Sequence, residues 1–173
     1  AMIGQTEKIA PADRKIYALR DVTATVDSIP LISASIMSKK IAEGCGGLVL
    51  DVKAGTGAFM KKIKDARLLA ESMTEIGKMN GLKMAAVITD MNQPLGAAVG
   101  NAIEVEQAIE IMSGGGPKDI KNLIIELAAM MIVTGGQADS LEDGRVKANR
   151  NLNNGKAMEK FIRIIEAQGP VFL

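Results

Sequence analysis

Apolar side chains recur at the spacing of an amphipathic helix through most of the chain, in segments that glycines or polar clusters separate. Apolar residues three and four positions apart share one helix face, as in a helix packed on one side. The stretch from Leu123 to Val133 is apolar nearly throughout, so we expect it to be buried on most of its faces. Residues 137–154 are polar, and Asp139 and Ser140 are typical of a helix cap. The spacing predicts helices over residues 11–20, 27–43, 61–79, 101–113, 117–133 and 155–168.

Two shorter runs have no helical spacing and are apolar almost throughout. LVLDV at residues 48–52 and LKMAAVITD at residues 82–90 predict buried strands of a parallel sheet. The order of strand, loop, helix and strand predicts an α/β fold with helices on a mostly parallel sheet. Two central strands do not make a self-sufficient sheet, so we expect this chain to be a piece of a larger fold.

Composition excludes several classes of function. Apolar residues make up 47% of the 173 residues and charged residues 24%, which is typical of a globular protein. The 21 basic and 20 acidic residues nearly cancel, which argues against a nucleic-acid surface. Histidine is absent and Cys45 is the only cysteine, so the sequence excludes Ser-His and Cys-His pairs, histidine-ligated metals, cysteine-cluster zinc and an internal disulfide. No apolar stretch reaches the ~18–20 residues of a membrane span and no leader opens the chain, so we expect a cytoplasmic protein.

One group of polar residues could bind an oxygen-rich planar molecule. Ser35 and Lys39 are four residues apart on one predicted helix and therefore point the same way. Arg20 ends the preceding helix, and a short reversal could return it to that face. An arginine fork, a lysine charge and a serine hydroxyl together suit a ring that carries carbonyl oxygens. The alternative, a solvated helix face, stays open at this point.

Glycine-rich and acidic positions at the strand ends offer weaker candidates. Gly55 and Gly57 follow the first strand and could cradle an anion with backbone N–H groups. The loop lacks the GxxxxGK[ST] pattern and the third glycine of a dinucleotide fingerprint, so a tight turn is the alternative. Asp51 and Asp90 lie at the two strand ends, where they could serve chemistry or cap loops.

Four stretches in order resemble the pyrimidine-nucleoside phosphorylases, a family that includes thymidine phosphorylase. They are KIYALRDVTATVDSIPLISASIMSKK (15–40), LVLDVKAGTGAFM (48–60), ITDMNQPLGAAVGNAIEV (88–105) and GGGPKDIKNLIIELAAMMI (114–132). The resemblance implies a three-layer α/β/α domain of the nucleoside phosphorylase–phosphoribosyltransferase type, with a partial sheet, over residues 44–173. It also implies that residues 1–43 are helices of a small all-α domain.

The resemblance implies a pentosyltransferase of pyrimidine metabolism. Such enzymes catalyse reversible phosphorolysis of uridine or thymidine to the free base and (deoxy)ribose 1-phosphate, as cytoplasmic homodimers. The family's arginine, serine and lysine that hold the pyrimidine fall on Arg20, Ser35 and Lys39, and Tyr17 would pack beside the base. As the glycosidic bond breaks, the departing pyrimidine gains negative charge, which fixed cationic donors stabilise.

The resemblance also implies what lies inside and outside this sequence. A monovalent cation, potassium, would be held by carbonyl oxygens at Leu95 and Ala98, and the family's glutamate ligand falls on Gln107. No organic cofactor is implied. The family's Lys-His-Ser-Thr-Gly-Gly phosphate loop and its C-terminal domain have no counterpart here, so we expect a catalytically incomplete fragment. The alternative is a non-catalytic remnant that acts as an oligomerisation or base-binding module, and a phosphoribosyltransferase would need a pyrophosphate loop that the sequence does not show.

Overall fold

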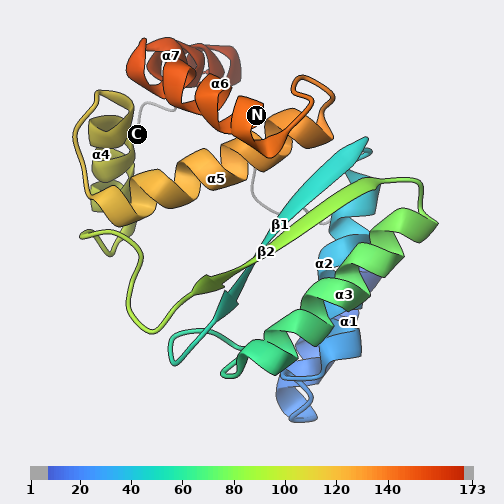
Figure 1. The fold of residues 1–173 in the computed structure, drawn as a ribbon. Coiled ribbons are helices and arrows are strands. Elements are labelled where there is room, and N and C mark those ends of the chain that lie inside the picture. The colour runs from blue at the N-terminus through green and yellow to red at the C-terminus, as the bar shows by residue number, and fades with distance from the viewer. Residues whose placement is uncertain (1–7, 170–173) are drawn as a thin grey trace. The chain divides into compact units, whose positions relative to one another are not determined.

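The structure is a computed structural model that describes residues 8–169 (Figure 1). These residues form two compact units, which we call the sheet unit (residues 8–93) and the helical unit (residues 94–169). The sheet unit contains α1 (Pro11–Val22), α2 (Ile29–Ala42), β1 (Gly47–Ala54), α3 (Ile63–Met79) and β2 (Lys83–Asp90). The helical unit contains α4 (Asn101–Met112), α5 (Lys118–Thr134), α6 (Leu141–Asn153) and α7 (Lys156–Gln168). The predicted helices and both predicted strands are therefore confirmed.

Local chemistry sets several of these boundaries. Pro11 occupies the first turn of α1, where its missing N–H leaves no intrahelical bond unmade. Gly44 follows α2 with φ +71°, and Gly81 follows α3 with φ +78°, a backbone conformation that other residues rarely adopt. The hydroxyl of Ser140 accepts a hydrogen bond from the N–H of Asp143 at 3.1 Å, which confirms the predicted cap of α6.

The core of the sheet unit lies between the two strands and the helices α2 and α3. β1 and β2 pair in parallel, with Gly47 opposite Lys83 and Ala54 opposite Asp90, and α3 connects them. Alternate residues of β1, Leu50, Val52 and Ala54, are buried. α1, α2 and α3 lie on one side of this sheet (Figure 1). The buried cluster consists of Met37, Leu50, Val52, Ala54, Met60, Ala66, Leu69, Ala70 and Met73. The predicted α/β class is therefore confirmed, with a sheet of two strands in the described residues.

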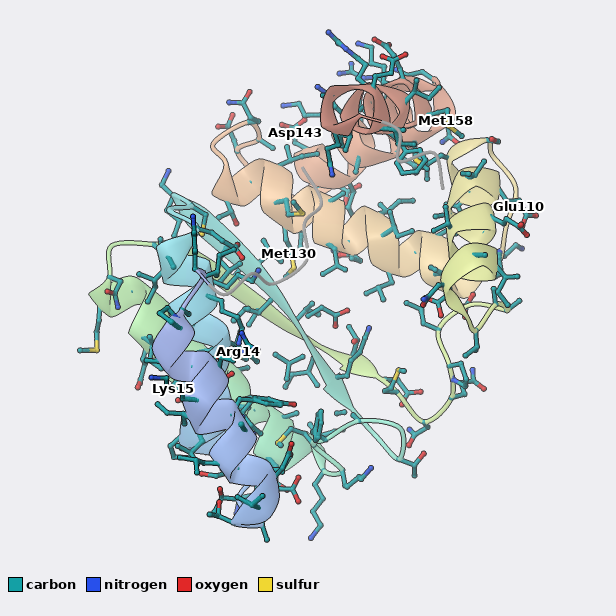
Figure 2. The ribbon with its side chains drawn as sticks, turned by 180° about the vertical axis from the view of Figure 1, so that it is seen from behind. Arg14, Lys15, Glu110, Met130, Asp143 and Met158 are labelled. Carbon is teal, nitrogen blue, oxygen red and sulfur yellow. The ribbon has the colours of Figure 1, made fainter. Side chains whose placement is uncertain are left out.

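The helical unit is built around a close pair of helices, α5 and α6. A Cβ atom on Gly144 would lie 2.8 Å from the backbone oxygen of Ala129, so only glycine allows the two helices to approach this closely. Arg145 of α6 forms an ion pair with Glu126 of α5 at 2.6 Å. Asp143, at the start of α6 (Figure 2), forms an ion pair with Lys147 at 2.7 Å.

The expectation that residues 123–133 are buried on most faces is wrong. Ala129 is the buried residue of α5, whereas Met131 is 63% exposed and Ile124 36% exposed. A helix that packs against one partner buries one stripe of side chains, and α6 is the neighbour with which α5 makes its extensive contact.

Two further expectations concern the chain as a whole. The domain boundary that we expect between residues 43 and 44 falls inside the sheet unit, where α2 packs against α3, and it stays a prediction. Within residues 8–169 no helix combines the length and the apolar character that a membrane crossing requires.

Candidate functional site

The buried face of α1 is polar. Asp13, Tyr17 and Arg20 are spaced four and three residues apart, so they share one face of this helix. Asp13 is 8% exposed and Arg20 4% exposed, and they are the two buried residues of α1. Arg14 and Lys15, between them in the sequence, are exposed (Figure 2).

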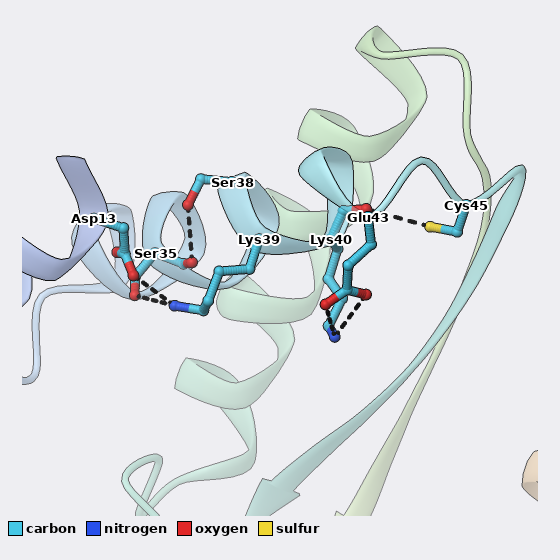
Figure 3. A network of polar contacts seen from close by, with 7 residues as sticks. All are labelled: Asp13, Ser35, Ser38, Lys39, Lys40, Glu43 and Cys45. Carbon is cyan, nitrogen blue, oxygen red and sulfur yellow. Dashed lines mark hydrogen bonds and ion pairs between the residues drawn. The ribbon is translucent and has the colours of Figure 1, made fainter. Parts of the chain in front are cut away.

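Residues of α2 meet this face (Figure 3). The ammonium of Lys39 donates a hydrogen bond to the hydroxyl of Ser35 at 3.0 Å and to the carboxylate of Asp13 at 2.7 Å. Ser35 is buried, and the side chain of Lys39 is 25% exposed. The helical spacing of Ser35 and Lys39 therefore places them in direct contact, and the alternative of a fully solvated helix face does not describe these two side chains.

The charges of this group balance in part. Burial alone would raise the pKa of Asp13, but hydrogen bonds from Lys39 and Ser35 and the positive charges of Lys39 and Arg20 outweigh burial and hold that pKa below its usual value. Asp13 is therefore an ionised carboxylate at neutral pH. With two cations and one anion, the group keeps one net positive charge.

Arg20 retains an unused donor. Its Nη2 donates to the backbone oxygen of Val26, and its guanidinium carbon lies 5.1 Å from the centre of the Tyr17 ring, within the range of a cation–π contact. Its Nε is buried and has no hydrogen-bond partner within residues 8–169. A buried N–H without an acceptor costs about 1–3 kcal/mol, so this position favours a ligand that brings an oxygen or nitrogen acceptor.

The reversal between α1 and α2 explains how Arg20 reaches this place. Ala24 has φ +53°, a left-handed conformation that is uncommon for alanine. The N–H of Thr25 donates to the backbone oxygen of Arg20 at 3.1 Å, which fixes the turn. The sequence predicts that such a reversal is possible, and the structure contains it.

The glycine-rich loop after β1 is closed by its own backbone. Each of four successive N–H groups donates to an oxygen of the sheet unit: Gly55 to Met60 at 3.0 Å, Thr56 to Asn92 Oδ1 at 3.1 Å, Gly57 to Met91 at 2.8 Å and Ala58 to Gly55 at 3.1 Å. A Cβ on Gly55 would lie 2.8 Å from the backbone nitrogen of Asn92, so glycine is required there. The structure therefore favours the tight turn over the anion cradle, because an anion needs N–H groups that are free.

The two candidate carboxylates also have partners. Asp90 ends β2 as expected, but Asp51 lies inside β1, which continues to Ala54, so the expectation that Asp51 ends a strand is wrong. Asp51 accepts hydrogen bonds from Lys53, at 2.6 Å, and from the hydroxyl of Thr89. Asp90 accepts from the N–H of Asn92 at 3.1 Å, so it caps the turn that follows β2. Both side chains brace local structure.

Comparison with known proteins identifies a matching family and several relatives. A family described as "Glycosyl transferase family, a/b domain" matches residues 1–158. The chain belongs to this family. It is 52% identical over 169 residues to the pyrimidine-nucleoside phosphorylase of Staphylococcus aureus (strain USA300), and 52% identical over 169 residues to that of Staphylococcus haemolyticus (strain JCSC1435). In both cases the match covers 98% of this chain and 39% of the relative, so the chain spans about two fifths of the length of these relatives.

The cation site that we expect in this glycosyl transferase family chain lies in the helical unit. Gln107 is 8% exposed, and its Oε1 accepts a hydrogen bond from the N–H of Ala97 at 3.2 Å, in the loop that contains Leu95 and Ala98. Ala98 and Gln107 also line a hollow of about 550 Å³ that Glu106 and Glu110 border. An amide oxygen has two lone pairs, so Gln107 can accept the N–H and still face a cation, and the residues present fit this group.

One member of the site is absent from the sequence-based set. Asp13 contacts Lys39, and its pKa is lowered by Lys39, Ser35 and Arg20, yet the family resemblance does not identify it. The spacing of seven residues between Asp13 and Arg20, two turns of one helix, puts both on one face of α1 but does not point to Lys39.

Proposed function

We propose that this chain supplies the pyrimidine-holding part of a pyrimidine-nucleoside phosphorylase, in which Arg20, Ser35 and Lys39 bind the base and Tyr17 packs beside it. The observation that carries the proposal is the buried Nε of Arg20, which has no hydrogen-bond partner among the described residues. Arg20 lies on the same helix as Asp13, which together with Ser35 holds the ammonium of Lys39 in place. The relatives that are pyrimidine-nucleoside phosphorylases by name support the same chemistry.

The proposed reaction is the reversible transfer of a pentosyl group between a pyrimidine and phosphate. A phosphate oxygen forms a bond to C1′ of uridine or thymidine while the bond from C1′ to the ring nitrogen breaks. The electron pair of that bond leaves with the base, whose nitrogen and carbonyl oxygens become negative. Arg20 and Lys39 stabilise this charge more in the transition state than in the bound nucleoside. Loss of one such donor typically lowers kcat about 10²–10³-fold.

The net charge of the group suits a leaving anion. Asp13 offsets one of the two cations, so the site is less positive than Arg20 and Lys39 alone would make it. One positive charge remains to meet the negative charge that develops on the base. Ser35 adds a hydroxyl that can donate or accept, which suits a ring edge with both kinds of group.

Other parts of the reaction are proposed to come from chain outside this sequence. The chain spans about two fifths of the length of its relatives, and the glycine-rich loop uses its own N–H groups. We therefore propose that phosphate binds to a segment not contained here, and that this chain alone binds the base without turnover. A monovalent cation held by Leu95, Ala98 and Gln107, cytoplasmic location and assembly as a homodimer belong to the same proposal. The cation would brace the loop from residue 95 to residue 98.

Titration with free base tests the proposed site directly. Isothermal titration calorimetry with uracil and with thymine should show binding by this chain, and Lys39→Met and Arg20→Met should each weaken it at least about tenfold through the loss of a charge-assisted hydrogen bond. Lys40→Met is the matched control, because Lys40 is adjacent in sequence and its ammonium contacts Glu43 at 3.0 Å, outside the group. Absence of binding by the wild-type chain, or equal losses in the Lys39 and Lys40 variants, would contradict the proposal.

A base-binding module without catalysis is the second candidate. The closed glycine-rich loop favours it, because the phosphate cradle that the sequence offered is occupied by internal hydrogen bonds. Incubation of the chain with thymidine or uridine and phosphate tests this candidate. Release of free base by this chain would show that its own residues bind phosphate, and would rule out the module.

A further inference from the structure

We propose that Asp13 is a positioning residue of the base site. Its carboxylate, from α1, holds the ammonium of Lys39 and acts on the hydroxyl of Ser35, both from α2, in the arrangement that receives the pyrimidine (Figure 3). This inference rests on the proposed function and adds a residue to it that contacts no substrate.

Burial shows a difference in roles within the ion pair. The side chain of Asp13 is 7% exposed, and that of Lys39 is 25% exposed. The carboxylate is therefore the more buried partner, and part of the lysine side chain remains accessible. An ammonium has three donors, of which Asp13 takes one at 2.7 Å and Ser35 takes another at 3.0 Å. Among the described residues the third donor has no acceptor, so it remains for a ligand.

A carboxylate can contribute to ligand binding by holding a flexible lysine side chain in one conformation. A free lysine side chain samples many rotamers, and a ligand that orders that side chain must overcome this entropy. The two hydrogen bonds that Lys39 donates, to Asp13 of α1 and to Ser35 of its own helix α2, order it before the ligand arrives. A preordered donor stabilises developing charge without reorganisation at the moment of reaction.

The environment of α1 supports a positioning role over a packing role. A helix whose purpose is packing buries an apolar stripe. α1 instead buries Asp13 and Arg20, while Leu19 is 59% exposed and Val22 80% exposed. The groups that act on the Asp13 carboxylate are Lys39, Ser35 and Arg20, which are the three residues assigned to the base from the sequence.

The first measurement needs no ligand. In ¹⁵N NMR spectra of the wild-type chain, the ammonium of Lys39, assigned from its loss in Lys39→Met, should give a resolved signal because its hydrogen bonds slow proton exchange. Asp13→Asn should broaden that signal or abolish it, and Asp13→Glu should restore it in part. Asp21→Asn, at an exposed position of the same helix, should leave it unchanged. A Lys39 signal that is unaltered in Asp13→Asn would overturn the proposal.

The second measurement links this contact to the base. Uracil or thymine should bind Asp13→Asn about tenfold more weakly than wild type, with partial recovery in Asp13→Glu, and the Asp13→Asn change should have no further effect in a Lys39→Met background. Circular dichroism checks that each variant folds. If Asp13→Asn does not fold, Asp13→Glu and Ser35→Ala replace it in the binding measurement.

The outcomes separate this inference from the function on which it rests. Equal binding by wild type and a folded Asp13→Asn overturns the role of Asp13 and leaves the proposed function intact. A wild-type chain with the Lys39 signal but without base binding overturns the proposed function, and the role of Asp13 with it. Additive losses from Asp13→Asn and Lys39→Met would show that Asp13 acts elsewhere.

Discussion

The two units of this chain are stabilised in different ways. The sheet unit has a continuous cluster of nine buried apolar residues, contributed by β1, α2, α3 and the loop at Met60. The helical unit has fewer buried positions, among them Ile111, Ala129 and Leu152, and α7 has none. The candidate base site lies in the unit with the continuous core. A group of polar side chains keeps its geometry only if the elements that carry it are held firmly.

The helical unit depends instead on close backbone approach and on ion pairs at the surface. Gly144 lets α6 contact the backbone of α5, and Arg145 connects the same helices through Glu126. Such contacts specify which helices pair, but apolar burial is the main source of stability, and the helical unit has fewer buried apolar residues. The comparison suggests that sensitivity to mutation differs between the units, and four substitutions test it.

The largest effect is expected at Met37, which is completely buried in the sheet unit. Met37→Ala removes atoms from the cluster and leaves a cavity, so we expect the free energy of unfolding to fall by about 2–5 kcal/mol. Urea denaturation followed by circular dichroism measures this. Met131→Ala, at a position of the helical unit that is 63% exposed, is the matched control and should change little. Equal effects of the two substitutions would remove the distinction between the units.

The next effect is expected at Gly144. Its substitution by alanine places a Cβ 2.8 Å from the backbone oxygen of Ala129, and α5 and α6 must separate. We expect a loss of about 1–3 kcal/mol, although alanine on its own favours a helix. Asn149→Ala, on an exposed part of α6, isolates the propensity effect and should not destabilise. If Gly144→Ala raised the free energy of unfolding, the contact between these helices would not be tight.

The third effect depends on pH and is expected at Asp13. Because the pKa of Asp13 is lower in the folded chain than its ordinary value of 3.8, the ionised carboxylate stabilises the fold above that value. This contribution disappears as the pH falls through the folded pKa. At about pH 7, Asp13→Asn should lower the free energy of unfolding by about 1–2 kcal/mol, because it removes the charged partner of Lys39.

The difference between wild type and Asp13→Asn should shrink below about pH 4. Urea denaturation of both proteins across the acid range, with Asp21→Asn as the exposed control, measures it. A difference that stays constant to the lowest pH would show that the Asn side chain perturbs packing and that the charge of Asp13 is not responsible.

The smallest effect is expected at Arg145, where the hydrogen bonds that it donates to Glu126 and Glu142 raise its pKa above the usual value. The side chains of Arg145 and Glu126 are 38% and 41% exposed, so solvent weakens their attraction. Arg145→Gln should lower the melting temperature slightly, and the difference should vanish in about 1 M sodium chloride, where screening is nearly complete. Arg163→Gln, whose pair with Glu159 at 3.7 Å is looser, should have less effect still.

Much of the fold was predictable because local rules decide it. Helical spacing, Pro11, Gly44 and the cap at Ser140 set element boundaries through the chemistry of neighbouring residues. The two apolar runs predicted both strands for the same reason. The burial of α5 was not predictable, because it depends on how many elements pack against that helix, and its sequence carries no information on that number.

The site was predictable in part. Ser35 and Lys39 lie one helical turn apart, so spacing alone placed them together. The contact between Asp13 and Lys39 spans 26 positions and depends on a reversal in which Ala24 takes a left-handed conformation. Alanine gives no signal for that conformation, so the partner of Lys39 could not be read from the sequence. The closure of the glycine-rich loop likewise depends on oxygens of Met91 and Asn92, which follow the other strand.

That closure limits how the segment from Gly55 to Ala58 can change over evolution. Its backbone bonds require a fixed number of residues between β1 and Met60, because one inserted or deleted residue would displace several donors from their oxygens together. The side chain of Phe59 is exposed and faces no such requirement, whereas the hydroxyl of Thr56 donates to the backbone oxygen of Asn92 at 3.3 Å. Length is therefore the constrained property of this loop, and the side chain at position 59 is free to vary.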